Sequence, residues 1–231
     1  MKKQHERTAL LIGEQGLETL RQSKVAVFGI GGVGGYAVEA LGRAGIGSLD
    51  LIDKDVVDET NLNRQIIALH STIGKDKVEV MASRLKDINP DIVVNTHKVF
   101  YLPENADDFD LTQYDYIIDA IDNVTAKLEL ASRAAAAGTP LIASMGTGNK
   151  TDAGGFRVMD ITETSGCPVA KVMRKELKNR DIHHIKVDYS ADAPLKNRPP
   201  GSIAFVPPVA GLMMAGEVVR ELLKKGGNIH V

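Results

Sequence analysis

The sequence predicts an α/β fold, a Rossmann-like doubly wound sheet that is mostly parallel and that carries a C-terminal extension of mixed strands. Three observations lead to this prediction. A glycine-rich turn joins a short apolar run to a helical pattern, such runs and patterns then alternate, and the alternation changes from Phe156 onward. Short apolar runs that alternate with amphipathic helices are typical of parallel strands buried on both faces.

The first strand–turn–helix–strand unit spans residues 24–53. Val25–Phe28 and Ser48–Ile52 are predicted as buried strands, and Tyr36–Ala44 as the helix between them. The turn after the first strand fits the pattern G-x-G-x-x-G with three glycines: Gly29, Gly31 and Gly34. The first glycine permits a tight turn, the second lets a phosphate approach the backbone, and the third allows the helix to pack close to the strand. Asp53 follows the second strand, where an acid binds ribose hydroxyls, so the unit predicts a nucleotide site without identifying the nucleotide.

Length and composition limit the classes to which the chain can belong. At 231 residues it suits one domain, and we expect residues 1–150 to form the nucleotide-binding core and residues 151–231 a substrate-side extension with a C-terminal helix. The single cysteine excludes an internal disulfide and a four-cysteine zinc site. It also favours the reducing cytoplasm, and no apolar run of roughly 20 residues or signal-peptide pattern indicates a membrane. The net charge of −2 is not that of a general nucleic-acid binder.

Polar side chains crowd the segment that follows Asp53. Asn61, Arg64 and Gln65 lie close together, and Lys77 stands at the start of a predicted helix. Arginine offers a planar fork for phosphate oxygens and lysine a mobile point charge, while asparagine bonds sugar or phosphate without adding charge. Taken singly, each is an ordinary surface group. As a set they suit a triphosphate better than a hydride carrier, which needs a nicotinamide pocket instead.

The remaining elements follow from hydrophobic periodicity and from glycine and proline positions. Further strands are predicted at Ile92–Phe100, Tyr116–Ala120, Leu141–Ser144, Phe156–Ile161, Ile185–Tyr189 and Ile203–Val206. Further helices are predicted at Gly13–Arg21, Lys75–Ile88, Asn123–Ala137, Val169–Asn179 and Pro207–Lys225. Two loops stand out, the glycine-rich MGTGNK at residues 145–150 and the proline-rich 191–202.

Acidic and amide side chains follow the predicted strand Tyr116–Ala120. Asp119, Asp122 and Asn123 lie at its carboxyl end, which is where open α/β sheets bind ligands. A carboxylate at this position can hold Mg²⁺ directly or through water, which is one interpretation of Asp122. The alternative is that Asp122 caps the next helix, and the two roles do not exclude each other.

A dense basic cluster lies in and after the predicted helix Val169–Asn179. Its cations fall off the apolar stripe of the helix or just beyond it: Lys171, Arg174, Lys175, Lys178, Arg180, His183, His184 and Lys186. Such a face is either a solvated helix surface or a contact surface for a phosphate backbone, and the sequence leaves both interpretations open. The two histidines have no third ligand at metal-like spacing, so we expect no metal there.

Cys167 directly precedes the same helix. A helix N-terminus lowers the pKa of a thiol, which makes a relay thiol feasible at this position. No histidine is spaced locally to serve it, however, and a free cysteine is often simply buried. The sequence therefore leaves a relay role for Cys167 as one of two interpretations.

The segments GIGGVGG, LIDKDVVDETNLNRQ, GKDKVE and DAIDN occur in this order and spacing. Through them the chain resembles, over nearly its whole length, the ubiquitin-activating-enzyme-like adenylyltransferases, the superfamily of ThiF, MoeB and HesA. Within it, SMGTGNK, KVMRKELK and PGSIAFVPPVAGLMMAGEVV are similar to the tRNA threonylcarbamoyladenosine dehydratases. The resemblance implies a single ThiF-type ATP-binding domain over residues 1–231. The zinc-binding cysteine pairs of many relatives are absent, and from the length we expect no separate ubiquitin-fold or large cysteine domain.

The resemblance also implies ATP and Mg²⁺ as cofactors and a role for each motif residue. Asp53 would bind the ribose, Asp122 would hold Mg²⁺, and Arg7 would reach the ATP of the other protomer of a homodimer. The ATP phosphates would lie against Gly29, Gly31 and Gly34, and would be held by Asn61, Arg64, Gln65 and Lys77. Four of these residues would be catalytic: Arg7, Arg64, Lys77 and Asp122.

The implied reaction is the ATP-dependent dehydration, with cyclisation, of threonylcarbamoyladenosine in tRNA. The substrate carboxylate attacks the α-phosphorus of ATP, pyrophosphate leaves, and a nitrogen of the carbamoyl arm closes a ring with release of AMP. Because the nucleophile is internal, no enzyme nucleophile is required. The tRNA backbone would contact the basic helix at Lys171, Arg174, Lys175 and Lys178.

Two alternatives remain open from the sequence. The first keeps the adenylation but acts on the C-terminus of a small ubiquitin-like or sulfur-carrier protein, with Cys167 as relay and a sulfur-transfer protein as partner. The second is an NAD-dependent oxidoreductase or a non-catalytic nucleotide sensor, which would have no use for Arg64 or Lys77.

Overall fold

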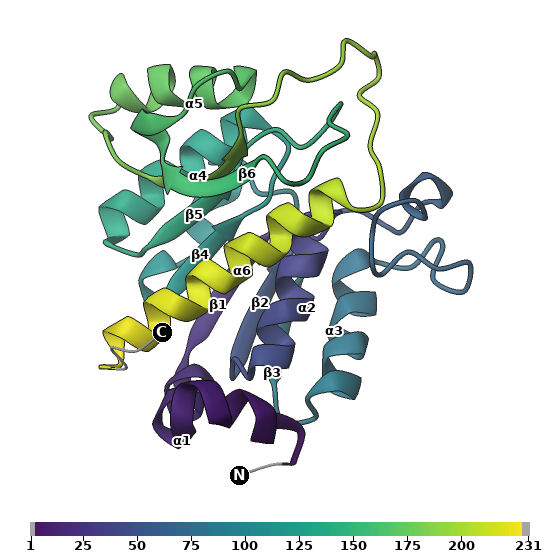
Figure 1. The fold of residues 1–231 in the computed structure, drawn as a ribbon, viewed down its shortest axis with the longest axis vertical. Helices are drawn as coiled ribbons and strands as arrows, with labels where there is room; N and C mark the ends of the chain where they lie inside the picture. The colour runs from purple at the N-terminus through teal and green to yellow at the C-terminus, as the bar shows by residue number, and fades with distance from the viewer. Residues whose placement is uncertain (1–2, 228–231) are drawn as a thin grey trace.

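One seven-stranded sheet runs through the molecule, with helices on both of its faces (Figure 1). The computed structural model describes residues 3–227. The strand order is β3-β2-β1-β4-β5-β7-β6, in which only β6 runs antiparallel to its neighbour, β7. This is the doubly wound, mostly parallel sheet with a mixed C-terminal extension that the sequence predicts, so the predicted fold class is confirmed.

The strands and helices have the following bounds. The strands are β1 Lys24–Phe28, β2 Ser48–Ile52, β3 Val93–His97, β4 Tyr116–Asp119, β5 Leu141–Ser144, β6 Phe156–Asp160 and β7 Lys186–Ser190. The α-helices are α1 Glu6–Gln22, α2 Gly34–Ala44, α3 Lys77–Ile88, α4 Val124–Ala137, α5 Pro168–Lys178 and α6 Val206–Lys225. Short 3₁₀ turns are η1 Lys3–His5, η2 Glu59–Asn61, η3 Pro103–Asp108, η4 Leu111–Gln113 and η5 Ile161–Glu163.

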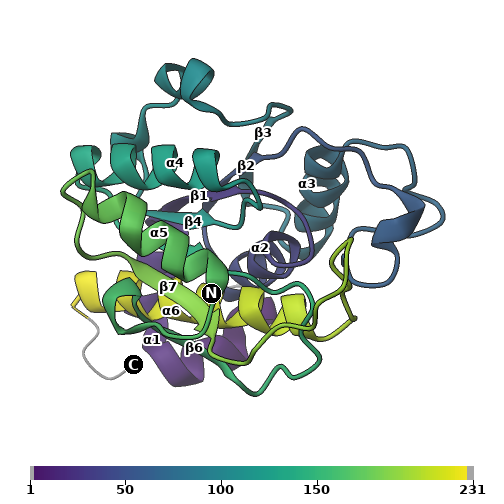
Figure 2. The ribbon, with the colours of Figure 1, turned by 90° about the horizontal axis from the view of Figure 1, so that it is seen from above.

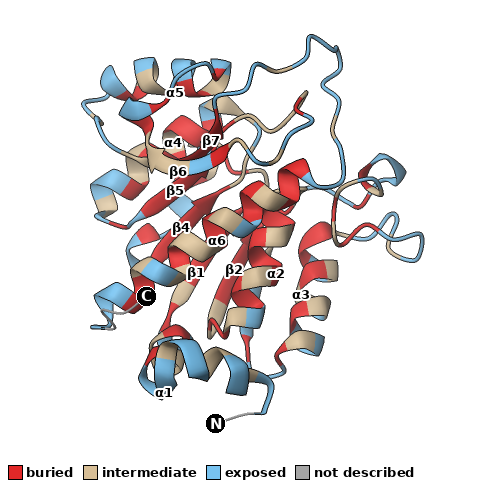
Figure 3. Cartoon of the chain, viewed as in Figure 1, coloured by how far each residue is buried: buried red, intermediate tan, exposed pale blue. Residues whose placement is uncertain are grey.

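The alternation of side chains along β1 explains why the sheet needs cover on both faces. Val25 and Val27 join a core with α1, α2, α3 and α6, whereas Ala26 and Phe28 join a second core with α4 and α5. All four side chains are fully buried. Figure 2, seen from above, shows the same two layers, and Figure 3 shows the buried strands between partly exposed helices. The sheet is therefore the middle layer of three.

Helix α1 starts earlier than the sequence predicts. The predicted start is Gly13. The helix begins at Glu6 and is broken at Gly13, whose φ of 72° and ψ of 171° are not helical. A glycine adopts this backbone conformation without steric cost. The glycine that the sequence marks as a boundary is therefore a kink inside a longer helical segment.

The predicted strand Ile203–Val206 is wrong. Residues 201–203 have no regular structure, Ala204 and Phe205 form a turn, and Val206 already begins α6. Proline is well suited to the first turn of a helix, and Pro207 and Pro208 occupy it here. A short apolar run cannot be assigned to strand or helix by periodicity alone, so the tertiary context decided this segment.

Helix α6 crosses the sheet and packs directly on α2. A Cβ added to Gly211 would lie 2.1 Å from the Val33 carbonyl oxygen, so the two backbones approach as closely as glycine permits. Val33 is the N-cap of α2, the helix that follows the glycine-rich turn. Helix α6 therefore packs against the end of that turn and supports it. Within residues 3–227, no helix combines the length and the apolar character needed to cross a bilayer.

Candidate active site

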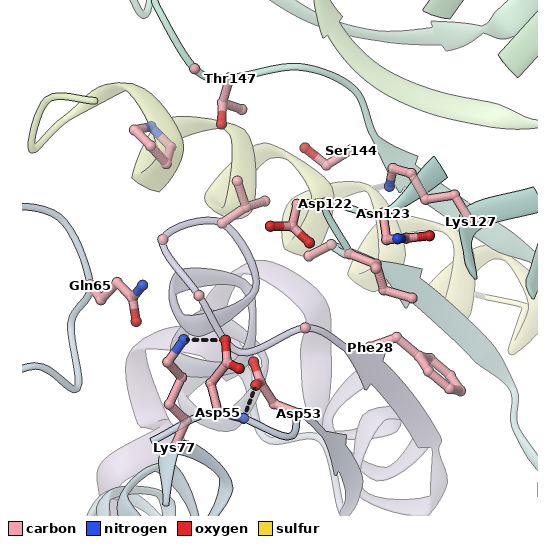
Figure 4. A pocket seen from close by; sticks show the side chains of 18 of the residues that line it. Phe28, Asp53, Asp55, Gln65, Lys77, Asp122, Asn123, Lys127, Ser144 and Thr147 are labelled. Atoms are coloured by element: carbon pink, nitrogen blue, oxygen red, sulfur yellow. Dashed lines mark hydrogen bonds and ion pairs between the residues drawn. The ribbon is translucent and has the colours of Figure 1, made fainter. Parts of the chain in front are cut away.

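A pocket of about 810 Å³ opens beyond the carboxyl ends of the parallel strands. It is lined by the glycine-rich turn, by residues at or just after the ends of β1, β2, β4 and β5, and by two loops at residues 146–148 and 200–202 (Figure 4). Strands β1 and β4 are neighbours, and the helices that follow them cover opposite faces. The pocket therefore lies at the topological switch point, where doubly wound sheets bind ligands.

The three glycines of the G-x-G-x-x-G turn are required for different physical reasons. Gly29 has φ +91°, and an added Cβ would lie 2.6 Å from the Ala120 carbonyl oxygen. At Gly34 the added Cβ would lie 1.8 Å from the Gly29 carbonyl oxygen, which leaves no room for any side chain. At Gly31 the nearest atom would be Gln65 Nε2, 3.8 Å away. Gly29 and Gly34 are therefore demanded by the fold, while Gly31 leaves open space on the pocket side.

Asp53 joins the end of β2 to the glycine-rich turn. Its Oδ2 accepts a hydrogen bond of 2.6 Å from Ile30 N–H. Its Oδ1 accepts one of 2.8 Å from Asp55 N–H, which is the dashed line at Asp53 in Figure 4. A carboxylate has about four acceptor sites, so these bonds leave capacity for a ribose hydroxyl. Asp53 lines the pocket where the sequence predicts the ribose ligand.

The four polar residues predicted to hold the triphosphate all line the pocket: Asn61, Arg64, Gln65 and Lys77. Asn61 accepts a hydrogen bond from Asp58 N–H, which closes a capping box at η2. Arg64 donates to the Thr60 carbonyl at 2.9 Å. Gln65 is buried, its Oε1 has no partner within residues 3–227, and its side chain faces the pocket in Figure 4. Turn η2 and the residues directly after it thus bring Asn61, Arg64 and Gln65 to the pocket.

Lys77 enters the pocket from the first turn of α3. Its backbone N–H donates to the Asp55 carbonyl at 3.0 Å, and its ammonium lies 3.2 Å from Asp55 Oδ2. The Lys77 side chain is 6% exposed and that of Asp55 is 51% exposed. The ammonium is thus largely removed from water and is balanced by a carboxylate that solvent reaches.

Asp122 lies exposed at the mouth of the pocket, and no hydrogen bond or ion pair engages its carboxylate among the described residues. The alternative that it caps α4 is wrong, because Asn123 is the N-cap and its Oδ1 accepts from Ala126 N–H at 3.0 Å. Within residues 3–227, no group of three or more His, Cys, Asp or Glu side chains is arranged so that it could hold a metal ion by itself. Mg²⁺ is commonly held by one or two carboxylates together with phosphate oxygens and water, so a single free carboxylate facing a phosphate site fits this ion.

Lys127 is a pocket residue that the sequence reasoning missed. Its side chain, 3% exposed, reaches from α4 to Asp119 at the end of β4, with 3.0 Å between Nζ and Oδ1. Complete burial raises the pKa of Asp119, and the Lys127 ammonium opposes that shift. The sequence signal was available, because Lys127 falls at helical spacing with the buried Leu130, Ala131 and Ala134.

Three further predicted features lie outside the pocket. Arg7 is exposed on α1, at the end of the sheet opposite to the pocket (Figure 1). Cys167 is 4% exposed and does not line the pocket, although a Cβ added to Gly146 would lie 4.0 Å from its Sγ. On α5, Arg174 donates to the Thr164 carbonyl at 2.8 Å. Exposed lysines on α5 are Lys171, Lys175 and Lys178.

Fold and pocket together define a doubly wound nucleotide-binding protein of the adenylating type, with cations where phosphates would lie. The ThiF family model matches residues 5–230, and the chain belongs to this family. A tRNA threonylcarbamoyladenosine dehydratase of Bacillus subtilis (strain 168) is 44% identical over 241 residues, which cover 96% of this chain and 95% of that protein. The Haemophilus influenzae enzyme of the same name is 42% identical over 186 residues, 79% and 71% of the two chains.

A solved structure gives the same result. The tRNA N6-threonylcarbamoyladenosine dehydratase of Escherichia coli, in complex with ATP, superposes with a TM-score of 0.93 at 33% sequence identity, over 98% of this chain and 96% of that one. The resemblance inferred from the glycine-rich turn and the motifs that follow it is therefore confirmed.

Proposed function

We propose that this protein catalyses the ATP-dependent dehydration of threonylcarbamoyladenosine in tRNA, with formation of the cyclic product through a carboxyl adenylate. The observation that carries the proposal is the 44% identity, over nearly the full length of both chains, with the Bacillus subtilis enzyme of that name. The ATP complex of the Escherichia coli relative supports the same nucleotide for this pocket. The polar residues of the pocket supply the physical rationale.

At the nucleotide end, the chain provides positive charge where negative charge accumulates. Lys77 and Arg64 would bind the β- and γ-phosphates and offset the charge that gathers on pyrophosphate as it leaves. The open side of Gly31 lets a phosphate approach the backbone. Asp53, fixed by the Ile30 and Asp55 amides, would orient the ribose and thereby the α-phosphorus.

Asp122 is the residue we assign to Mg²⁺. When bound, the ion supplies further neutralisation of the triphosphate and a fixed geometry for its oxygens. The carboxylate of Asp122 is exposed at the pocket mouth, on the side opposite to Lys77 (Figure 4). A triphosphate between them would meet cations on one side and the carboxylate-held ion on the other.

The end of the pocket at residues 144–147, here called the acceptor end, suits the carboxylate-bearing arm of the substrate. Ser144, Gly146 and Thr147 line it together with the apolar side chains of Met145 and Val169. Apolar surface around a reactive adenylate excludes water, which would hydrolyse it. The ring-closing nucleophile belongs to the substrate itself, so its effective concentration is high and Cys167 has no necessary role.

The tRNA, a second protomer and the cellular location complete the proposal. The exposed lysines of α5 and Arg174 would contact the anionic RNA backbone, since phosphate contacts supply much of the affinity for nucleic acids. Arg7 would reach the ATP of the second protomer in a homodimer. We take residues 1–231 as one functional unit in the cytoplasm, with residues 1–150 as its nucleotide-binding core.

The test is nucleotide turnover with two tRNA preparations, one carrying threonylcarbamoyladenosine and one lacking it. We expect pyrophosphate release only with the modified tRNA, and mass spectrometry of its nucleosides should show the loss of one water. Equal pyrophosphate release from both preparations would contradict the proposed substrate. The alternative of a sulfur-carrier acceptor is tested by Cys167→Ala, because only that alternative uses Cys167 as a relay thiol. We expect the variant to keep full tRNA dehydration activity, since Cys167 is buried and does not line the pocket.

A further inference from the structure

The MGTGNK loop and the 191–202 segment are distant in sequence but are bonded to each other beside the pocket. Asn149 and Lys150 of the first loop make these bonds. The Lys150 ammonium is buried and donates to the Ser190 carbonyl at 3.2 Å and to the Asp192 carbonyl. It thereby fixes the beginning of the second segment, immediately after β7.

Asn149 holds the rest of that segment with four hydrogen bonds. Its backbone N–H donates to the Gly201 carbonyl at 2.8 Å, and its carbonyl accepts from Leu195 N–H at 2.7 Å. Its side chain adds two bonds, since Oδ1 accepts from Gly201 N–H at 2.6 Å and Nδ2 donates to the Asn197 carbonyl at 3.0 Å. Asn149 has φ +60°, a left-handed conformation that asparagine adopts more readily than most residues.

The held segment forms part of the pocket. Pro200, Gly201 and Ser202 line it opposite to Gly148, and a Cβ added to Gly148 would lie 3.3 Å from Pro200 Cβ. The segment is also bonded to the nucleotide end, because Asn63 Nδ2 donates to the Ser202 carbonyl at 3.0 Å and Arg64 donates to Asn63 Oδ1 at 2.9 Å. A continuous set of hydrogen bonds thus runs from Asn149 to Arg64.

We propose that Asn149 is a positioning residue that holds residues 195–202 so that the last three of them form a wall of the pocket between Gly148 and Arg64. This inference rests on the proposed function. Residues 191–202 are exposed apart from Pro194 and Ser202, so burial alone does not hold this wall in place. The side-chain bonds of Asn149 hold it where the tRNA arm must pass to reach ATP. Loss of these bonds impairs the use of tRNA, whereas the ATP contacts at Asp53 and Lys77 stay intact.

The informative variant is Asn149→Gly. Glycine adopts φ +60° without strain and keeps both main-chain bonds, so only the two side-chain bonds are lost. We expect kcat/KM for the modified tRNA to fall about tenfold, as the loss of two hydrogen bonds implies. We expect KM for ATP and the midpoint of thermal unfolding to change much less than kcat/KM for tRNA, because the contacts of Asp53 and Lys77 are retained. Asn149→Asp keeps the acceptor for Gly201 N–H and should recover part of the activity.

Limited trypsin digestion gives a readout that does not depend on activity. Lys196 is exposed within the held segment, and we expect Asn149→Gly to accelerate cleavage after it, because cleavage requires the backbone to open locally. The matched control is Asp152→Ala, which removes a hydrogen bond of the same loop to Gly154 N–H and leaves the 195–202 segment untouched.

The outcomes are distinct. A wild-type protein that does not dehydrate the modified tRNA overturns the proposed function. A wild-type protein that is active, with an Asn149→Gly variant of equal kcat/KM and equal cleavage rate, overturns the role of Asn149. An equal loss of tRNA use, ATP use and thermal stability would also overturn it, since it would indicate a purely structural role.

Discussion

The Lys77 ammonium lies 3.2 Å from Asp55 Oδ2, and of the two side chains only that of Asp55 is exposed to solvent. An ammonium held largely out of water interacts more strongly with an incoming anion than one on the surface does. The exposed Asp55 carboxylate balances the charge of the Lys77 ammonium without blocking the pocket. The pair therefore keeps a cation in place for a phosphate group.

Replacement of Lys77 by methionine removes this charge while keeping most of the side-chain volume. We expect AMP formation to fall by roughly 100-fold or more, the size of effect seen when one group that stabilises transition-state charge is lost. The measurement is the rate of AMP release with saturating tRNA. The control is Lys75→Met, because Lys75 is exposed and does not line the pocket. Equal activity of the Lys77 and Lys75 variants would contradict the role of Lys77.

The glycine-rich turn allows a matched pair of alanine substitutions. Gly31→Ala meets no atom closer than 3.8 Å, so the variant should fold normally and bind ATP more weakly, because a methyl group would stand where the phosphate approaches. Gly34→Ala would place its Cβ 1.8 Å from the Gly29 carbonyl oxygen and should destabilise the fold. Thermal unfolding with and without ATP separates the two effects. A strongly destabilised Gly31→Ala variant would contradict this division of roles.

The Lys127–Asp119 pair predicts a loss of stability that a second substitution reduces. Lys127→Met leaves the fully buried Asp119 carboxylate without its cation, which costs roughly 3–5 kcal/mol when one partner of a buried pair is removed. The double variant Lys127→Met/Asp119→Asn removes both charges and should recover part of that loss. Urea unfolding of the single and double variants measures the difference. Additive effects of the two substitutions would show that the pair is not coupled.

Asp188 predicts a pH dependence of stability. It is fully buried on β7, neither carboxylate oxygen has a hydrogen-bond partner among residues 3–227, and burial raises its pKa well above the ordinary value. Between the unfolded and folded pKa values the folded state binds more protons, so the stability contributed by this group is complete below about pH 4 and is lost as pH rises through the folded pKa.

The variant Asp188→Asn removes this ionisation. We expect its free energy of unfolding to fall less with rising pH than that of the wild type, so the variant gains relative stability toward neutral pH. Denaturant titrations at several pH values give the comparison. Parallel stability curves for the two proteins would contradict a buried ionisable Asp188.

The proposed RNA surface on α5 is tested by two double variants that have the same net charge as each other. Lys171→Ala/Lys175→Ala and Lys3→Ala/Lys224→Ala each remove two exposed cations, from opposite ends of the molecule (Figure 1). Loss of two phosphate contacts should reduce the slope of log K against log salt for tRNA by about 1.5. We expect this reduction only in the α5 variant. Equal salt dependence of both variants would place the RNA elsewhere.

The sequence predicted the central strands β1, β2, β4 and β5 well because each is a short, mostly apolar run. The glycine-rich turn located the nucleotide pocket, since such a turn between a strand and a helix is where this unit binds phosphates. The strand predicted at Ile203–Val206 failed because the same apolar run serves as the entry to a helix. Local pattern does not distinguish these two uses.

The pocket was predicted less completely than the fold. Asp53, predicted after the second strand, and Lys77, predicted at the start of a helix, both line the pocket. Lys127 was missed although its partner Asp119 lies only eight residues earlier, because a lysine on an alanine-rich helix is ordinarily a surface residue. Asn149 was missed because its importance comes from Gly201, some fifty residues away, and such a pair becomes visible only when the chain is folded.

Helix α6 has a consequence for any attempt to divide this protein. In its first turn, Pro207 lies against Gly32 in the pocket. Further along, Gly211 allows the helix to pack closely on the N-terminus of α2. Near its other end, Glu221 accepts a hydrogen bond from Tyr116 on β4. A fragment that ended at residue 150 would keep every nucleotide motif yet expose one side of the central strands. Shortened versions of the protein for ligand screening must therefore retain the last helix, because the pocket is lined both by the first strand–helix unit and by the start of α6.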